Sequence, residues 1–186
     1  MLHAVILLSC AIAPAAAATA VEEQVEICLT CHGVDADQPE TPILDGQPAL
    51  FLQTQLDLFR GGQRGEMAMT DIAAGLAEEE IPALAAQFAA RPPPGPAAGP
   101  ADPALAALGR EAAVRHRCIT CHLPTFAGQA QMPRLAGQRE AYLRKALRDY
   151  QSGARVGAGA MMADVMTGVS EAEMAALAHY LAHLGG

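Results

Sequence analysis

A five-residue pattern that occurs twice constrains this 186-residue chain more than any other feature. CLTCH covers residues 28–32 and CITCH covers residues 118–122, a separation of 90 residues. The similarity continues downstream, where residues 42–64 align without a gap on residues 133–155, and the stretch from Met69 aligns on the stretch from Met162. The chain is therefore two copies of one unit, each with its own pair of cysteines.

A proline-rich stretch separates the two copies. Residues 89–103 read AARPPPGPAAGPADP, and proline at this density ends helices and favours extended backbone. The sequence predicts an N-terminal domain at residues 21–90, a semi-rigid linker at 91–101 and a C-terminal domain at 102–186.

The first twenty residues are apolar and then rich in alanine, as in a secretory signal peptide. ATA at residues 18–20 offers a cleavage site before Val21, and AAA at 15–17 offers another. The alternatives are a lipoprotein attached through Cys10 and an uncleaved membrane anchor, which needs about 20 strongly apolar residues. We expect residues 1–20 to be removed and the mature protein to be periplasmic and soluble.

Apolar residues recur at helical spacing in both units and predict an all-α fold. One helix is expected downstream of each repeated motif, and another closes each unit. The apolar stripes are Phe51, Leu52, Leu56 and Phe59 with Tyr142, Leu143, Leu147 and Tyr150, then Ile81, Leu84 and Phe88 with Met174, Leu177 and Leu181. Ser170 and Glu173 predict a capping box before the last helix, and no stretch alternates apolar and polar residues as a strand does.

The C-x-x-C-H pattern is the attachment signature of c-type haem. Two thiols add to the two porphyrin vinyl groups, and the histidine that follows is positioned to bind iron. The predicted thioether sites are Cys28, Cys31, Cys118 and Cys121, and the predicted iron ligands are His32 and His122. A structural zinc site expects cysteine pairs about 15–20 residues apart, and a thioredoxin-type dithiol expects a strand-rich unit. Two small units with only four Phe and three Tyr between them also need a group that fills each core.

These motifs, with the GQ and YL residues downstream and the later methionines, resemble the class I cytochromes c. The tandem arrangement resembles the two-haem cytochromes of the c-four type, and the resemblance covers nearly the whole mature chain. It implies two all-α haem domains, two covalently bound haem c groups and single-electron transfer. Catalysis is not expected, because a haem with histidine and methionine ligands has no vacant position for a substrate.

The resemblance implies a methionine as the second axial iron ligand in each unit, and a thioether raises the reduction potential relative to a second histidine. Met69 and Met162 occupy matched positions before the final predicted helix, where the family places this ligand. We therefore predict these two as ligands. The other three candidates, Met67, Met161 and Met166, are assigned to packing or loops, and Met67 and Met161 are the fallback ligands.

Two further matched pairs are expected in the haem pockets. Pro42 and Pro133 stand where the family uses a proline carbonyl to accept the second ring N–H of the histidine ligand, which fixes its tautomer. Arg64 and Arg155 suit haem propionates, because a guanidinium binds carboxylates in bidentate geometry. Plain loop prolines and exposed arginines are the alternatives.

The remaining histidines have no partner in the repeat. His179 and His183 lie at i, i+4 on one helix face, a spacing that suits a metal ion. Since neither they nor His116 are matched in the first unit, we predict surface or half-buried residues without a ligand role.

The helix that leads into each motif departs from the family pattern. Family members carry a glycine and an aromatic residue there, which pack on the last helix, whereas the second unit has Gly109 with Ala112 and Ala113. The first unit has only seven residues from Val21 to its motif. We expect a short first helix there, or earlier cleavage.

The net charge of −8 conceals an asymmetry between the units. Residues 21–100 hold 13 acidic residues against three arginines, a net −10, whereas residues 101–186 hold seven acidic against nine basic residues, a net +2. We hypothesise that the two domains dock on different partners. The alternative is an acidic surface that only keeps an exported protein soluble.

The resemblance implies a monomer that passes electrons from a cytochrome bc complex or a dehydrogenase to a terminal oxidase. Contact with the membrane is expected only through such partners, and nucleic acid has no role. Two alternatives stay open: a dihaem peroxidase-like enzyme, in which one iron lacks its sixth ligand, and a fixed electron-relay subunit of a membrane oxidase or dehydrogenase complex.

Overall fold

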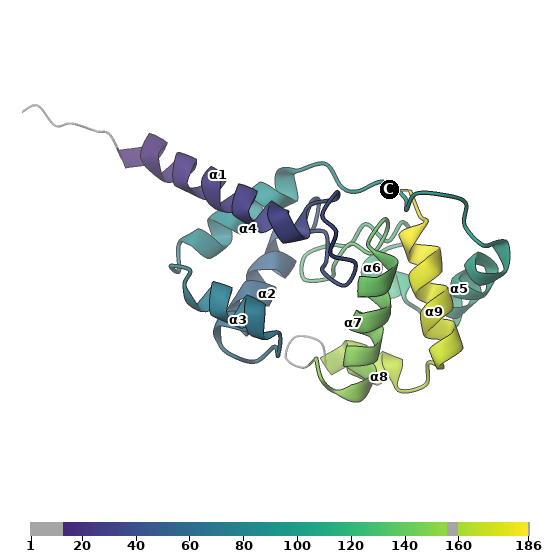
Figure 1. Ribbon diagram of the computed structural model, residues 1–186. Helices are drawn as coiled ribbons and strands as arrows, with labels where there is room; N and C mark the ends of the chain where they lie inside the picture. Colours follow the sequence, from purple (N-terminus) through teal and green to yellow (C-terminus); the bar gives the residue numbers. More distant parts are fainter. Residues whose placement is uncertain (1–12, 156–159, 186) are drawn as a thin grey trace, which may run out of the picture.

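The computed structural model describes residues 13–155 and 160–185 as helices joined by loops, with no strand in those ranges (Figure 1). The helices are α1 (Ala13–His32), α2 (Ala49–Arg60), α3 (Met67–Ala74), α4 (Glu80–Ala90), α5 (Pro103–Arg115), α6 (Ile119–His122), α7 (Glu140–Ser152), α8 (Ala160–Met166) and α9 (Glu171–Ala182). The repeat is visible in their order, since α2, α3 and α4 correspond to α7, α8 and α9. The predicted all-α fold of two tandem units is confirmed.

The start of the chain is only partly described. Cys10 and most of the predicted signal peptide lie outside the described residues, and α1 runs from Ala13 through the predicted cleavage point to His32. None of the described helices is both long and apolar enough to cross a membrane.

Each unit has its own apolar core. In the N-terminal unit, Phe51 and Leu52 of α2 pack with Leu84 and Phe88 of α4. In the C-terminal unit, α9 packs against α5 and α7, and its predicted apolar stripe is buried. The six residues of the two final helices that the periodicity predicts to be buried are all buried: Ile81, Leu84, Phe88, Met174, Leu177 and Leu181.

Helix α9 lies beside α5 (Figure 1). At one contact between them only glycine fits. A Cβ atom at Gly109 would lie 2.2 Å from the carbonyl oxygen of Ala176. Ala112, one turn further along α5, is fully buried. The aromatic contact comes from α9 itself, where Tyr180 meets the buried Phe126 edge-on at 6.1 Å between ring centroids. Small residues on α5 thus replace the aromatic of the family pattern by letting the helices approach.

The N-termini of α9 and α5 are capped by side chains. Ser170 Oγ accepts from the backbone N–H of Glu173 at 3.3 Å, and the Glu173 carboxylate accepts from the backbone N–H of Ser170 at 3.0 Å. This confirms the predicted capping box. The carboxylate of Asp102 caps α5 by accepting from the N–H groups of Ala104 and Leu105.

The proline-rich segment packs against both units. Gly46 and Gly137, which match in the repeat, adopt φ values of +69° and +73°. A Cβ atom at Gly46 would lie 2.6 Å from the Cβ of Pro93, and one at Gly137 would lie 2.6 Å from the carbonyl oxygen of Gly95. The two matched glycines therefore allow the linker to pack closely on both units, because a side chain at either position would clash with it.

Candidate functional site

The two C-x-x-C-H motifs are reached by different backbone paths. In the N-terminal unit the motif is the last turn of α1, with Cys28 half-buried and Cys31 exposed one turn later. In the C-terminal unit Arg117 adopts φ 55° after α5, and the short α6 follows Cys118. Burial raises the pKa of the Cys28 and Cys118 thiols. None of the four motif cysteines, Cys28, Cys31, Cys118 and Cys121, forms a disulfide.

Each motif histidine is buried and held by a proline carbonyl. His32 Nδ1 donates to the Pro42 oxygen at 2.8 Å, and His122 Nδ1 donates to the Pro133 oxygen at 2.9 Å. Since a proline carbonyl can only accept, the proton sits on Nδ1 and the lone pair on Nε2. Burial lowers the pKa of both imidazoles, against the opposing effect of the proline bond. Both rings are therefore presented as neutral Nε2 ligands.

The Nε2 atom of His122 tests whether a metal group fits here. It is buried and has no hydrogen-bond partner among the described residues. Buried polar atoms almost always have a partner, so an orphaned imidazole lone pair in the interior calls for one. Iron is a suitable partner, because neutral imidazole nitrogen is a common iron ligand. The C-terminal unit thus fits a haem with His122 as its iron ligand.

The methionines divide by burial. Met69 on α3 and Met162 on α8 are half-buried, and Met162 packs against the C-terminal core. The fallback candidates Met67 and Met161 are 83% and 60% exposed, and Met166 is buried at 2%. The predicted ligands lie on the separate short helices α3 and α8, which precede the final helices, and their partial burial favours them over their exposed neighbours.

A cluster of cations lies where the two units meet. The backbones of Arg64 and Arg155, which match in the repeat, form an isolated antiparallel bridge. Gln55 Oε1 accepts from Arg64 Nη1 at 2.6 Å and from Arg155 Nη2 at 2.9 Å. Tyr142 Oη accepts from Arg155 Nη1 at 3.2 Å. Burial raises the pKa of Tyr142, but the two guanidiniums outweigh it and lower this pKa to about 8.

The cluster suits an anionic ligand. Each guanidinium also lies over an aromatic ring, Arg64 at 4.4 Å from the Phe59 centroid and Arg155 at 4.6 Å from that of Tyr150. Neither arginine takes part in an ion pair among the described residues, although Arg155 is only 7% exposed. Buried charges are normally paired, so two adjacent cations fit incoming carboxylates such as haem propionates.

Two glutamines that sequence reasoning did not assign join the units. Gln47 Nε2 donates to the Arg134 carbonyl at 2.9 Å and its Oε1 accepts from the Arg134 N–H at 3.0 Å. Gln138 makes the same pair of bonds with the backbone of Ile43, both at 2.9 Å. The available signal was the GQ dipeptide that recurs at the same place in each repeat.

Arg139, also unassigned from the sequence, reaches from the C-terminal unit into the loop that follows His32. Its Nη1 donates to the Thr41 carbonyl at 2.7 Å, and its Nη2 donates to the carbonyls of Gly33 and Ala36, the latter at 3.0 Å. This loop leads to Pro42, so one unit helps to shape the histidine pocket of the other.

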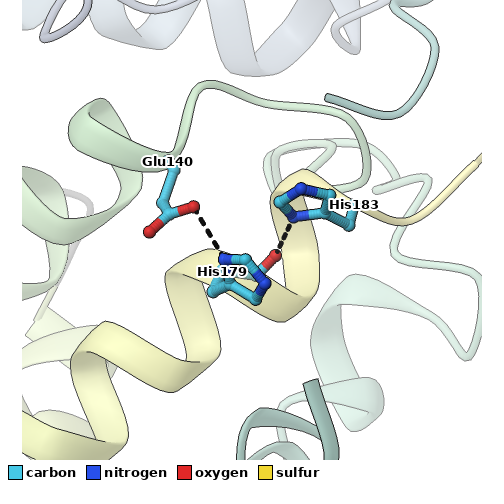
Figure 2. A group of neighbouring side chains, drawn as sticks. All are labelled: Glu140, His179 and His183. Atoms are coloured by element: carbon cyan, nitrogen blue, oxygen red, sulfur yellow. Dashed lines mark hydrogen bonds and ion pairs between the residues drawn. The ribbon is translucent and has the colours of Figure 1, made fainter. Parts of the chain in front are cut away.

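One histidine prediction is wrong. His116 and His183 are half-buried, but His179 is buried, at 9% exposure, between α7 and the start of α5. Its ring is fixed by Glu140 of α7, and His183 lies one turn further on, at the C-cap of α9 (Figure 2). The sequence could not reveal this burial, because the polar partners come from two other segments.

The comparisons with known proteins agree with this geometry. The family model for cytochrome c matches residues 106–185. A thiosulfate dehydrogenase electron acceptor from Stutzerimonas stutzeri is 36% identical over 85% of this chain and 79% of its own length. A cytochrome c4 from Pseudomonas aeruginosa is 31% identical, over 88% of this chain and 87% of its own length.

A solved structure shares the arrangement of both units. The crystal structure of reduced cytochrome c4 from Pseudomonas stutzeri superposes with a TM-score of 0.79 at 31% identity, covering 90% of this chain and 98% of that one. The relatives are electron carriers, which decides against the peroxidase alternative. The chain therefore belongs to the cytochrome c family, as a two-haem electron carrier of the cytochrome c4 type with two covalently bound haem c groups.

Proposed function

We propose that this protein is a periplasmic carrier that takes electrons from thiosulfate dehydrogenase and delivers them to a terminal oxidase. The donor is suggested by the relative from Stutzerimonas stutzeri, which is named as the electron acceptor of that enzyme. A cytochrome bc complex is the alternative donor. The observation that carries the electron-transfer role is the buried, unpartnered Nε2 of His122, since it presents an iron ligand inside a closed core.

Each predicted residue has a distinct part in this proposal. The thiols of each motif attach haem, His32 and His122 bind the iron, and Pro42 and Pro133 fix the tautomer of those rings. When bound, haem c supplies a one-electron iron couple. Met69 and Met162 would be the second iron ligands, and Arg64 and Arg155 would hold the haem propionates at the contact between the units.

The proposed mature protein is a monomer. Residues 1–20 are removed on export, residues 21–90 and 102–186 form the two haem domains, and residues 91–101 join them. The end of α4 at Ala90 and the start of α5 at Pro103 agree with these boundaries. The glycines that hold the linker support a fixed placement of one domain on the other.

A redox titration of the mature protein, followed by optical and magnetic spectroscopy, tests the role directly. We expect two haems, low-spin iron at both in the oxidised and reduced states, and a methionine signature at each. Replacing Met162 with alanine should make one haem high-spin and lower its reduction potential, because the thioether ligand is lost. Met69→Ala should do the same at the other haem.

The exposed neighbours are matched controls for these variants. Met161→Ala and Met67→Ala should leave both spin states unchanged, because these side chains lie mostly in solvent. If Met161→Ala made a haem high-spin and Met162→Ala left both haems low-spin, Met161 and not Met162 would be the iron ligand. High-spin iron at either site of the unaltered protein would contradict the carrier role.

The charge asymmetry of the sequence supports separate docking faces. Glu22, Glu23 and Glu26 lie on α1 beside the first motif, and all three are exposed. The exposed arginines near the second motif are Arg110, Arg115 and Arg117. A basic partner therefore favours the N-terminal domain and an acidic partner favours the C-terminal domain.

Neutralising the acidic face should weaken one set of encounters only. The triple variant Glu22→Gln, Glu23→Gln and Glu26→Gln is expected to exchange electrons about tenfold more slowly with a small basic cytochrome c at low salt, because electrostatic steering is lost. Stopped-flow rates over a range of salt concentrations measure this. Glu111→Gln, in the C-terminal unit, is the control. An unchanged salt dependence with basic and acidic partners alike would refute separate docking.

A further inference from the structure

Three potential metal ligands converge where α7 begins and α9 ends (Figure 2). Glu140, His179 and His183 each offer a ligand atom, and these atoms lie within 4.8 Å of one another. The Glu140 carboxylate is 3.0 Å from His179 Nδ1, and the two imidazole centroids are 4.2 Å apart. Two histidines at i, i+4 with a carboxylate from a second helix form a ligand set typical of zinc.

The repeat shows that the fold does not need these three side chains. Their counterparts in the N-terminal unit are all alanine: Ala49, Ala86 and Ala90. That unit forms the same pair of helices, α2 and α4, without any polar group at these positions. Packing of this helix pair therefore does not by itself require three ligating side chains at these positions.

The hydrogen bonds locate the protons at this cluster. His179 Nε2 accepts from the backbone N–H of Asp102 at 2.9 Å, so its proton is on Nδ1 and is donated to Glu140. His183 Nδ1 donates to the carbonyl of His179 at 2.9 Å, which leaves the lone pair on its Nε2. Without an ion, His179 thus ties the start of α5 to α7.

We propose that Glu140, His179 and His183 form a binding site for a divalent transition-metal ion of the zinc type, separate from the haems. Two imidazoles and a carboxylate fill three positions, and water takes the fourth. His179 binds through Nδ1 when its proton moves to Nε2, with no net loss of a proton. The protonated Nε2 can no longer accept from Asp102, so ion binding competes with the bond that holds the N-cap of α5 to α9.

Zinc titration of the mature holoprotein in its reduced state tests the site. Zn²⁺ does not exchange electrons with haem, and reduced low-spin haem leaves amide resonances sharp. Calorimetry should show one Zn²⁺ bound in the micromolar range or tighter. Amide spectra should show a shifted Asp102 resonance with faster hydrogen exchange, because its acceptor is lost.

Two histidine variants separate the site from other surface groups. His183→Ala keeps both His179 bonds and introduces the residue found in the N-terminal unit, and it should lower zinc affinity about tenfold or more. His116→Ala removes a different histidine, whose Nε2 lies 3.2 Å from Glu173, and it should bind zinc as the unaltered protein does. Haem spectra and circular dichroism check that each variant is folded.

Three results would overturn the site. The first is no zinc binding in the micromolar range, and the second is equal binding by His183→Ala and the unaltered protein. The third is binding that leaves the Asp102 amide unperturbed, because His179 would then not be a ligand.

Discussion

A chain in which Cys118 and Cys121 are both replaced by serine is expected to keep one covalent haem and lose the other. The thioether bonds of the second site cannot form, and the small C-terminal unit then loses the apolar area that a bound haem would bury. Residues 102–186 should become sensitive to protease while the N-terminal unit stays haem-bound. Mass spectrometry and haem staining of denatured protein measure the loss.

Two further cysteine variants make this result specific. The double variant Cys28→Ser and Cys31→Ser should give the opposite result, in which the C-terminal unit keeps its covalent haem and the N-terminal unit loses its own. Cys10→Ser should change nothing in the mature protein, because Cys10 lies in the predicted signal peptide. Two covalent haems in the Cys118 and Cys121 double variant would show that the motif is not the attachment site.

Replacing Gly109 with alanine is expected to lower the free energy of unfolding of the C-terminal domain by about 1–3 kcal/mol. The added Cβ would lie 2.2 Å from the Ala176 carbonyl oxygen and 2.6 Å from the Tyr180 Cβ, so α5 must move away from α9. The backbone of a packed helix cannot move aside to relieve such a clash, whereas the end of a flexible side chain can. Thermal unfolding measures this change, and we expect the midpoint temperature to fall by about 4–8 °C for each kcal/mol lost.

A second glycine of the same unit controls for the general effect of an added methyl group. A Cβ atom at Gly168 would meet nothing within 4 Å, and the backbone there is not left-handed, so Gly168→Ala should be nearly neutral. Equal midpoints for Gly109→Ala and the unaltered protein would mean that the helix contact is looser than the structure shows.

Local sequence patterns predicted much of the fold and of the candidate site. The spacing of Cys118, Cys121 and His122 is dictated by covalent chemistry within one stretch of chain, so it is readable without a structure. The stripes of α4 and α9 follow from helical periodicity, which reports one buried face. The capping box depends only on residues three positions apart, and it too is present.

Local sequence patterns could not predict contacts between segments that lie far apart in the chain. Gln47 and Gln138 bond to backbone groups of the opposite unit, so their role depends on how two folded units meet. His179 is buried by partners 39 and 77 positions away, Glu140 and Asp102. Where the family pattern has an aromatic residue, α5 has small residues and approaches α9 closely at Gly109, and the family pattern alone does not anticipate this contact.

The matched bonds of Gln47 and Gln138 make the contact between the units isologous, the kind that two-fold homodimers use. One surface meets its own copy, although both copies belong to a single polypeptide. The linker turns their association into an intramolecular event, so the pairing does not weaken as the protein is diluted. In a dimer, two redox units are paired only when the protein concentration exceeds the dissociation constant. Here they stay paired at any concentration in the cell.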